Sequence, residues 1–423
     1  LPTWALFVDL VKAFDTIDRE LMFQILAKFG IPELMIYAIR RLYDASEIKL
    51  NMGTEKGSIK NTIGVKQGDA MAAVLFIIVM QQAMAETLTP LWEGAKIATP
   101  EFRFHKETNG KMKGQNTKTK GTAFNLFLSL YVDDGSFLFE SKPDLAKGAL
   151  ILYHHMRRFG LLMHIRKDGR KSKTEALYIP PPGTEALCTD KDKIFVDNTD
   201  QGYVTFNRRF TYLGSIITED LGDSDEIHAC LGKANGILHG LNNLWRSKGL
   251  SVSMKKQFYI ATVVNIVLWG CKSLTIRAAD LKKLEVFHHK AMRHILSITK
   301  WQQATTRLTN HNLQKKLDYI ATMEEIIDER RLDWLGTVAR QSDEKLPKKL
   351  LTAWIMNTRK TGGQKQTLRD YNASAINRML VYNGVATNPS TECPSKTWIP
   401  LAQNLTKWKQ LVFRRRENRL ASK

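Results

Sequence analysis

Residues 126–139 read Leu-Phe-Leu-Ser-Leu-Tyr-Val-Asp-Asp-Gly-Ser-Phe-Leu-Phe, and this stretch decides the fold. Two apolar, aromatic-rich runs flank Tyr131-Val132-Asp133-Asp134-Gly135, and each run has the length and composition of a buried strand. Asp-Gly between two such runs is typical of a tight hairpin turn, because glycine adopts the positive φ that the turn requires. The stretch is therefore predicted to be a β-hairpin with an aspartate pair at its tip.

The aspartate pair has two interpretations. As turn residues, Asp133 and Asp134 need no further role. Two adjacent carboxylates between apolar strands, however, repel each other by about 4 kcal/mol at about 4 Å and an effective dielectric of about 20. A divalent cation would remove that cost, so a third carboxylate in a matching context would favour a metal site.

Length and composition favour a globular protein that binds a polyanion. The chain has 423 residues, enough for two or three domains with a buried core, and its net charge of +21 favours nucleic acid over a membrane surface. The longest apolar run, Ala70–Met80, is too short to span a bilayer, and no secretion signal is recognised. Four scattered cysteines form no zinc motif, which is typical of free thiols in a reducing, intracellular compartment.

The order of predicted elements indicates an α+β fold, an antiparallel sheet with helices on one face. Residues 4–10 read as a strand that ends near Asp9, and Asp18 is predicted to cap a helix of about three turns. Further predicted elements are helices over 33–43, 70–88 and 143–160 and short strands within 47–65. Residues 99–121 are polar and basic, and they are predicted to form a solvated loop or an extended hairpin.

Asp9 supplies the third carboxylate. A strand ending in Asp, a passage of helices and strands, and a hairpin with Asp-Asp at its tip form the layout of a polymerase palm. Nucleotidyl transfer joins a 3′-hydroxyl to an α-phosphate, and two Mg²⁺ ions stabilise the attacking and leaving oxygens. Carboxylates on adjacent strands offer the oxygen ligands that Mg²⁺ prefers. Asp9, Asp133 and Asp134 therefore predict a two-metal site for Mg²⁺, with Mn²⁺ as the alternative.

Five short motifs follow one another in order along residues 3–217. They are Phe7-Val-Asp-Leu-Val-Lys-Ala-Phe-Asp15, Gly64-Val-Lys-Gln-Gly68, Tyr131-Val-Asp-Asp134, Ser172-Lys-Thr-Glu175 and Phe210-Thr-Tyr-Leu-Gly214. This series resembles motifs A to E of reverse transcriptases, most closely those of non-LTR (LINE-type) retrotransposons. Leu268–Cys271 and Arg330–Gly336 resemble, more distantly, later segments of the same proteins.

The resemblance implies a domain order and an activity. Residues 1–183 would form the palm with partial fingers, 184–300 the primer-grip hairpin and helical thumb, and 301–423 a basic helical C-terminal domain. The protein would be an RNA-directed DNA polymerase that extends a DNA 3′-hydroxyl on an RNA template. The fingers motifs and endonuclease that relatives carry upstream of Asp9 are not in this sequence, so we expect the isolated chain to be a weak polymerase or inactive.

The resemblance also implies roles for single residues. Asp9 and Asp133 would ligate both metal ions, with Asp134 assisting and the carbonyl of Leu10 as a backbone ligand. Lys173 would be the general acid that protonates pyrophosphate, against the alternative of an ordinary surface lysine. The residues implied to bind the nucleotide are Leu10, Lys12, Ala13, Phe14, Gln67, Gly68 and Tyr131. The primer grip would be Tyr212, Leu213 and Gly214, against the alternative of a simple strand and turn.

Phe14 separates the polymerase classes. Five residues after Asp9, its ring would lie under the sugar and exclude a 2′-hydroxyl, whereas an RNA-making palm enzyme would need a polar group there. Phe14 therefore favours dNTP substrates and, with Tyr-Val before Asp-Asp, disfavours an RNA-dependent RNA polymerase. A decayed or domesticated copy that binds nucleic acid without catalysis stays open, although the three aspartates weigh against it.

The expected partners are an RNA template, a DNA primer or target and dNTPs, with no membrane. We expect a nuclear site of action with a cytoplasmic ribonucleoprotein stage, since the basic C-terminal tail is typical of a nuclear-import signal or a basic arm. Five tryptophans offer surfaces on which bases could stack: Trp245, Trp301, Trp334, Trp354 and Trp408. Aromatic residues in helices more often belong to the core, so the sequence assigns none of them to a base.

Overall fold

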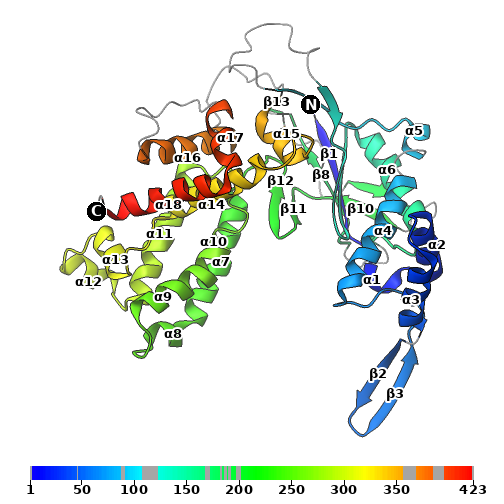
Figure 1. Cartoon of the computed structure of the whole chain (residues 1–423), viewed down its shortest axis with the longest axis horizontal. Coiled ribbons are helices and arrows are strands. Elements are labelled where there is room, and N and C mark those ends of the chain that lie inside the picture. The colour runs from blue at the N-terminus through cyan, green and yellow to red at the C-terminus, as the bar shows by residue number, and fades with distance from the viewer. Residues whose placement is uncertain are drawn as a thin grey trace. The chain divides into compact units, whose positions relative to one another are not determined.

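The computed structural model describes residues 2–44, 46–86, 91–106, 122–166, 172–181, 183–184, 188, 192–196, 202–355, 368–383 and 395–421. The chain packs into two compact units (Figure 1): Leu1–Glu101 with Asn125–Leu221, and Phe102–Phe124 with Gly222–Lys423. The domain boundaries at residues 183 and 300 stay a prediction. The central part of the predicted insert, residues 107–121, lies outside the described residues.

A mostly antiparallel six-stranded sheet forms the centre of the first unit. Its strands, in spatial order, are β6 (Leu128–Tyr131), β7 (Asp134–Phe139), β1 (Thr3–Val8), β8 (Glu175–Ile179), β10 (Tyr203–Phe206) and β9 (Lys193–Phe195). β1 runs antiparallel to both of its neighbours, β7 and β8, and β8 runs parallel to β10. The hairpin predicted over residues 126–139 is confirmed, because β6 and β7 pair with Tyr131 opposite Asp134.

Alternate residues of the central strands face two different layers. Leu6, Phe137 and Phe139 point into the main core, which the sheet shares with α2 (Arg19–Lys28), α4 (Ala70–Glu86) and α6 (Lys142–Arg157). Ala5 and Phe7 point to the opposite face, where they pack with residues of a separate hairpin of β11 (Arg209–Tyr212) and β12 (Ser215–Thr218). The α+β architecture predicted from the sequence is therefore present, with an antiparallel-rich sheet.

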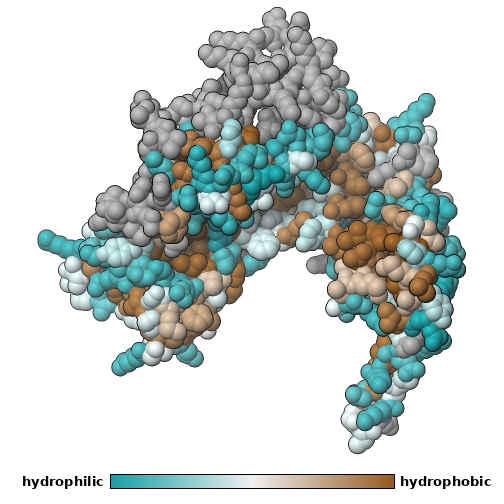
Figure 2. Space-filling model, viewed as in Figure 1, coloured by the Kyte–Doolittle hydropathy of each residue, from teal (hydrophilic) through white to brown (hydrophobic). Residues whose placement is uncertain are grey.

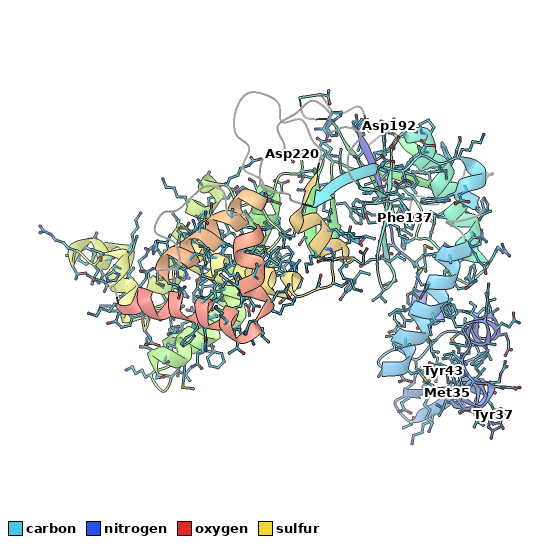
Figure 3. All side chains as sticks on the ribbon, turned by 45° about the horizontal axis from the view of Figure 1, so that its top comes forward. Met35, Tyr37, Tyr43, Phe137, Asp192 and Asp220 are labelled. Carbon is cyan, nitrogen blue, oxygen red and sulfur yellow. The ribbon has the colours of Figure 1, made fainter. Side chains whose placement is uncertain are left out.

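The helices of the first unit begin and end close to where the sequence predicts. Asp18 caps α2, since its carboxylate accepts from the backbone N–H of Leu21 at 3.0 Å. α3 (Glu33–Asp44) buries Tyr43 and leaves Met35 and Tyr37 exposed (Figure 3), and apolar side chains also remain on the surface of α4 (Figure 2). The remaining elements are α1 (Ala13–Thr16), α5 (Trp92–Ala95) and the hairpin of β2 (Glu47–Met52) and β3 (Glu55–Lys60).

The buried guanidinium of Arg19 fastens three segments of this unit together. It donates to backbone carbonyl oxygens at distances of 2.5 to 3.2 Å, those of Tyr43, Asn61, Ile63 and Gly64. Its Cζ also lies 5.0 Å from the centroid of the Tyr43 ring. Four oxygen acceptors compensate much of the cost of burying the charge, so the loop after β3 is held against the start of α2.

The second unit is mainly helical. Its helices are α7 (Ser224–Gly240), α8 (Asn242–Arg246), α9 (Val252–Tyr259), the π-helix Ile260–Val264, α10 (Asn265–Val267), α11 (Ala278–Ile295), α12 (Lys300–Thr305), α13 (Asn310–Lys316), α14 (Met323–Ala339), α15 (Leu346–Thr352), α16 (Leu368–Tyr382), α17 (Ser395–Gln403) and α18 (Leu405–Ala421). β13 (Ala353–Ile355), β4 (Glu101–Lys106) and β5 (Thr122–Asn125) form a small sheet. One apolar core lies among α7 to α14, and another joins α14 to α16, α17 and α18.

In the first of these two cores, hydrogen bonds link Tyr259, His288 and the carbonyl group of Ala321. Burial lowers the pKa of His288 to about 4, so its imidazole is neutral at physiological pH. Its Nε2 lies 3.0 Å from the carbonyl oxygen of Ala321 and therefore carries the proton, which leaves Nδ1 to accept from the Tyr259 hydroxyl at 2.9 Å. His288 is thus a satisfied core residue.

Gly148 is required where α6 crosses β7. A Cβ at this position would lie 2.6 Å from Cζ of Phe139, whose ring is completely buried and has no room to move. We expect Gly148→Ala to destabilise the first unit by about 1–3 kcal/mol through overpacking, as measured by thermal or denaturant unfolding. The double variant with Phe139→Leu should lose less than the sum of the two single changes, and strict additivity would contradict this packing account.

Candidate active site

Three charged residues lie level with one another at one end of the central strands. The register of β1 and β7 pairs Val8 with Gly135, so the next pair along is Asp9 with Asp134. The register of β1 and β8, continued in the same way, brings Lys173 to the other side of Asp9. Residues that are level across antiparallel strands project from the same face. We call Asp134, Asp9 and Lys173 the charged row.

The backbone of Asp9 is fixed by a neighbouring loop. Its N–H donates to Oγ1 of Thr174 at 3.2 Å, and its carbonyl oxygen accepts from the backbone N–H of His164 at 2.8 Å. Thr174 is completely buried, and the hydroxyl of Ser172 lies within hydrogen-bonding distance of the carbonyl oxygens of His164 and Thr174. The loop that carries Lys173 is therefore tied to the backbone of Asp9, which sets the spacing within the charged row.

The tip of the β6–β7 hairpin consists of Val132 and Asp133. Val132 has a φ of +58°, a costly conformation for a β-branched residue that persists only where the surrounding structure imposes it. This corrects the prediction that Gly135 reverses the chain. Gly135 lies inside β7, where a Cβ would come 2.9 Å from Cε2 of Phe137, so glycine is needed there for space.

The carboxyl groups of Asp9 and Asp134 are harder to ionise than ordinary aspartates. Partial burial is the largest cause that raises the pKa of both, and repulsion from Asp133 and Asp9 raises the pKa of Asp134 further. Lys173 acts in the opposite direction on both groups, and its Nζ lies 3.9 Å from Oδ2 of Asp9. The row and the turn therefore hold an excess of negative charge that a cation would stabilise.

A pocket of about 540 Å³ opens beside the charged row. Its lining residues come from the strand ends and from the β11–β12 hairpin: Phe7, Val8, Asp9, Asp134, Gly135, Ser172, Lys173, Glu175, Arg209, Phe210, Thr211, Tyr212, Leu213 and Ile216. The predicted site residues among them are Asp9, Asp134, Lys173, Tyr212 and Leu213. The structure thus brings the strand-end aspartates, the predicted general acid and most of the predicted primer grip to one pocket.

The hairpin on the far side of this pocket turns at Leu213 and Gly214. Both residues have positive φ, +50° and +80°, as a two-residue type I′ hairpin turn requires. The ring of Phe210 stacks on Phe7 with 4.3 Å between centroids, which fixes the hairpin on the sheet. Residues 212–214 are therefore a strand end and its turn, lying at the pocket that contains Asp9.

The residues that follow Asp9 are packed against helix α4. Leu10 is buried and bridges Met163, while Lys12, with a φ of +45°, precedes the short helix α1. Ala13 is buried, and the half-buried ring of Phe14 stacks on Phe76 at 4.7 Å between centroids. This stacking on α4 therefore holds the Phe14 ring in one orientation.

The loop at residues 64–68 lies directly on this turn. A Cβ on Gly64 would come 2.6 Å from the carbonyl carbon of Asp15, and the backbone N–H of Val65 donates to the carbonyl oxygen of Phe14 at 2.6 Å. The side-chain amide of Gln67 donates to Oδ1 of Asp15 at 3.3 Å. Gln67 and Gly68, like Lys12, Ala13, Phe14, Tyr131 and Asp133, lie outside the pocket lining described above.

Several residues that shape the site escape sequence reasoning. Thr174 and His164 hold Asp9 through backbone contacts between distant segments, and Arg19 acts in the same way on the loop at residues 61–64. Arg209 lines the pocket and has no carboxylate partner in the described part of the first unit, whereas Arg208 pairs with Glu219 at 3.9 Å. One feature of the sequence points to Thr174, namely its position next to Lys173. For His164, Arg19 and Arg209, the residue type alone indicates no role in the site.

Among the described residues, no group of three or more His, Cys, Asp or Glu side chains lies close enough together to hold a metal ion with the side chains as they stand. No described helix combines the length and the apolar composition needed to cross a membrane.

Comparison with known families identifies the class of protein. The family model described as reverse transcriptase (RNA-dependent DNA polymerase) matches residues 1–217, just over half of the chain. The charged row, the β6–β7 turn and the β11–β12 hairpin except its last residue, Thr218, lie within that match. The chain therefore belongs to the reverse transcriptase family.

Solved structures with some similarity include two of telomerase from Candida tropicalis, the apo enzyme and a complex with the TWJ fragment of telomeric RNA. Both are 12% identical with a TM-score of 0.34, and they match 84% and 79% of this chain. This chain spans about half the length of the two telomerase chains, 54% and 49%. Similarity at this level carries no argument about the fold. No curated protein matches the chain.

The raised pKa of Asp134 predicts that the site destabilises the fold at neutral pH. The folded state holds the proton more tightly than the unfolded chain, so stability falls as pH rises from the ordinary value of 3.8 through the raised one. Asp134→Asn should therefore stabilise the first unit by roughly 0.5–1 kcal/mol at pH 7 and by nothing below about pH 3.5, in unfolding experiments across pH. Glu140→Gln, an exposed acid of the same unit, is the control. A stabilisation independent of pH would contradict the electrostatic explanation.

Proposed function

We propose that the chain is the polymerase part of a LINE-type retrotransposon protein, an RNA-directed DNA polymerase that extends a DNA 3′-hydroxyl on an RNA template. The observation that carries the proposal is the charged row at the pocket beside the β11–β12 turn. Two carboxylates and a lysine on one face of a rigid sheet suit the handling of a triphosphate. In this proposal the six-stranded sheet is the palm, β11–β12 is the primer grip, and α7 to α11 are the thumb.

Divalent cations are part of the proposal. Asp9, Asp133 and Asp134, with the carbonyl oxygen of Leu10, would supply the oxygen donors that Mg²⁺ or Mn²⁺ takes. The raised pKa values of Asp9 and Asp134 support this, because partial burial, and for Asp134 also repulsion from its acidic neighbours, makes both carboxylates costly to ionise, and a bound cation would offset that cost. Asp133, which lies in the β6–β7 turn next to Asp134, would be the third carboxylate. When bound, the ions would stabilise charge on the attacking and leaving oxygens.

Lys173 is proposed to protonate the leaving pyrophosphate through Nζ. In the charged row its ammonium group lies 3.9 Å from Asp9, and its side chain is 70% exposed and can move towards a bound triphosphate. The hydrogen bonds of Thr174 and Ser172 hold its backbone beside the carboxylates, which an ordinary surface lysine would not need.

Phe14 and the loop at residues 64–68 are proposed to receive the nucleotide. Stacking on Phe76 holds the Phe14 ring in place. Because the ring has no polar atom that could accept a 2′-hydroxyl, it supports dNTP substrates. The backbone N–H groups of Lys12 and Ala13 would meet the triphosphate. Gln67, Gly68 and Tyr131 would complete the nucleotide and template side of the site.

The LINE-type assignment draws on the second unit. The two segments that resemble LINE proteins, Leu268–Cys271 and Arg330–Gly336, contact each other, since Arg330 donates to the carbonyl oxygen of Leu268 at 3.3 Å. Gly336 leaves the space in which the indole of Trp408 packs, because a Cβ there would lie 2.5 Å from Cδ1. Two segments recognised separately thus belong to one packed body, which supports the assignment. Nuclear action on a DNA target, with a cytoplasmic ribonucleoprotein stage, is part of the same proposal.

The direct test is template-dependent synthesis. We expect slow dTTP incorporation on poly(rA)/oligo(dT) with Mg²⁺, little UTP incorporation, and a loss of about 100-fold or more in Asp9→Asn and in Asp133→Ala, because each removes charge stabilisation at the reacting phosphate. Glu140→Gln should retain the parent rate. Nucleic-acid binding without any incorporation would favour the decayed-copy alternative, and fast, sustained synthesis would contradict the expectation that this chain is a weak polymerase.

Lys173 has its own kinetic signature. As a general acid, Lys173→Ala should lower kcat by about 100-fold or more while changing KM for dTTP much less. Lys173→His should recover part of the rate with an optimum at lower pH, because imidazole loses its proton at lower pH than an ammonium group. Single-turnover rates measured from about pH 5.5 to 9 provide the comparison. An equal loss in both variants with an unchanged pH optimum would contradict the general-acid role of Lys173.

A further inference from the structure

Trp301 is the most exposed aromatic side chain in the described part of the protein, at 73%. It lies on α12, a short helix in which no residue is buried, at one edge of the second unit (Figures 1 and 3). Most other described tryptophans of this unit are buried: Trp245 and Trp408 are 1% exposed, Trp398 is 5% exposed, and Trp334 packs against the core, whereas Trp269 is 55% exposed. The expectation that helical tryptophans belong to the core therefore fails for Trp301.

Hydrogen bonds fix the position of α12, the helix that carries Trp301. Thr299 and Gln302 form a reciprocal capping box at the start of α12. Gln303 receives a hydrogen bond from Arg293 of α11 at 3.0 Å and donates to the carbonyl oxygen of Leu308 at 3.1 Å. The indole is thus presented by a helix that is tied to α11 on one side and to the start of α13 on the other, which lowers the entropic cost of using it in binding.

The stretch of sequence around Trp301 is basic and contains no acids. Residues 286–317 contain no Asp or Glu and six cations: Lys290, Arg293, Lys300, Arg307, Lys315 and Lys316. Lys300, Arg307, Lys315 and Lys316 are exposed and have no carboxylate partner among the described side chains of residues 202–351. Lys300 precedes Trp301 in α12, and Arg307 follows the end of this helix, which is about 9 Å long at about 1.5 Å per residue. The backbones of both cations therefore lie within about 10 Å of the backbone of Trp301.

An isolated indole among cations suits one class of ligand. Between residues 287 and 318 no other large apolar side chain is exposed, so this segment does not itself present the contiguous apolar area that a protein partner would cover. A nucleic-acid duplex would meet the cations but would hide the faces of its bases. A single strand offers phosphates to the cations and an unpaired base face to the indole.

We propose that Trp301, Lys300 and Arg307 form a binding site for single-stranded nucleic acid, with an unpaired base stacked on the indole and the flanking phosphates paired with the two cations. The site lies on the second unit, whereas the charged row lies on the first. It does not require polymerase activity, so failure of the one proposal leaves the other standing.

The test uses the whole chain and fluorescent single strands of about 12 nucleotides, oligo(rU), oligo(dT) and an abasic strand of equal length. Trp301→Ala should weaken binding of the two base-bearing strands by at least about fivefold and should leave the abasic strand unchanged, because only a base can stack. Trp301→Phe should recover most of the affinity. Equal losses for oligo(rU) and oligo(dT) identify a site that reads bases and phosphates, and a larger loss for oligo(rU) identifies one that also reads the 2′-hydroxyl.

The cations have a separate signature. Lys300→Ala combined with Arg307→Ala should reduce the slope of log affinity against log salt by about 1.4, whereas Trp301→Ala should leave the slope unchanged. Trp269→Ala removes another exposed tryptophan, 55% exposed, from the same unit and serves as the matched control. The proposal is overturned if Trp301→Ala changes affinity by less than twofold, or if it weakens the abasic strand equally. Unchanged thermal unfolding of each variant excludes a folding defect.

Discussion

The position of β1 between β7 and β8 is the constraint on which the site depends. Because β1 pairs with a neighbour on each side, its register sets which residues of β7 and of the loop before β8 stand beside Asp9. A slip of one residue in either pairing would turn the side chains of a strand to the opposite face, into the core or out of it. The apolar contacts of Leu6 and Phe137 on one face and of Phe7 on the other make such a slip costly.

The site also concentrates features that work against stability. Val132 and Leu213 form the tips of two hairpins at positive φ, and Asp9 and Asp134 stand level with each other with raised pKa values. Strain and like charge persist where a well-packed structure over-determines them, and here the main core behind the sheet supplies that packing. Two strained turns and a pair of like charges thus lie at the place where the proposed chemistry occurs.

Local patterns predicted the elements well and the long-range contacts poorly. The hairpin over residues 126–139 and the cap at Asp18 follow from neighbouring residues, and the structure confirms both. The turn was assigned to Gly135 because Asp-Gly is a turn signal, but pairing of β7 with β1 draws Gly135 into the strand. Thr174 and Arg19 act on segments far away in the sequence, and no local pattern reveals the contacts that they make there. The basic composition of residues 286–317 is evident from the sequence, whereas the exposure of the Trp301 side chain is evident only from the structure.

The distribution of acids in the second unit has a consequence for regulation. From residue 227 to 317 the chain has two acids, Asp280, which is buried, and Glu285, which is half-buried. The charge of this surface therefore comes from lysine and arginine, which stay protonated up to about pH 9, and acidification adds only histidine charges. A cell could not switch such a surface off by a change in pH. Competing polyanions, ionic strength, or acetylation of its lysines are the controls to which it can respond.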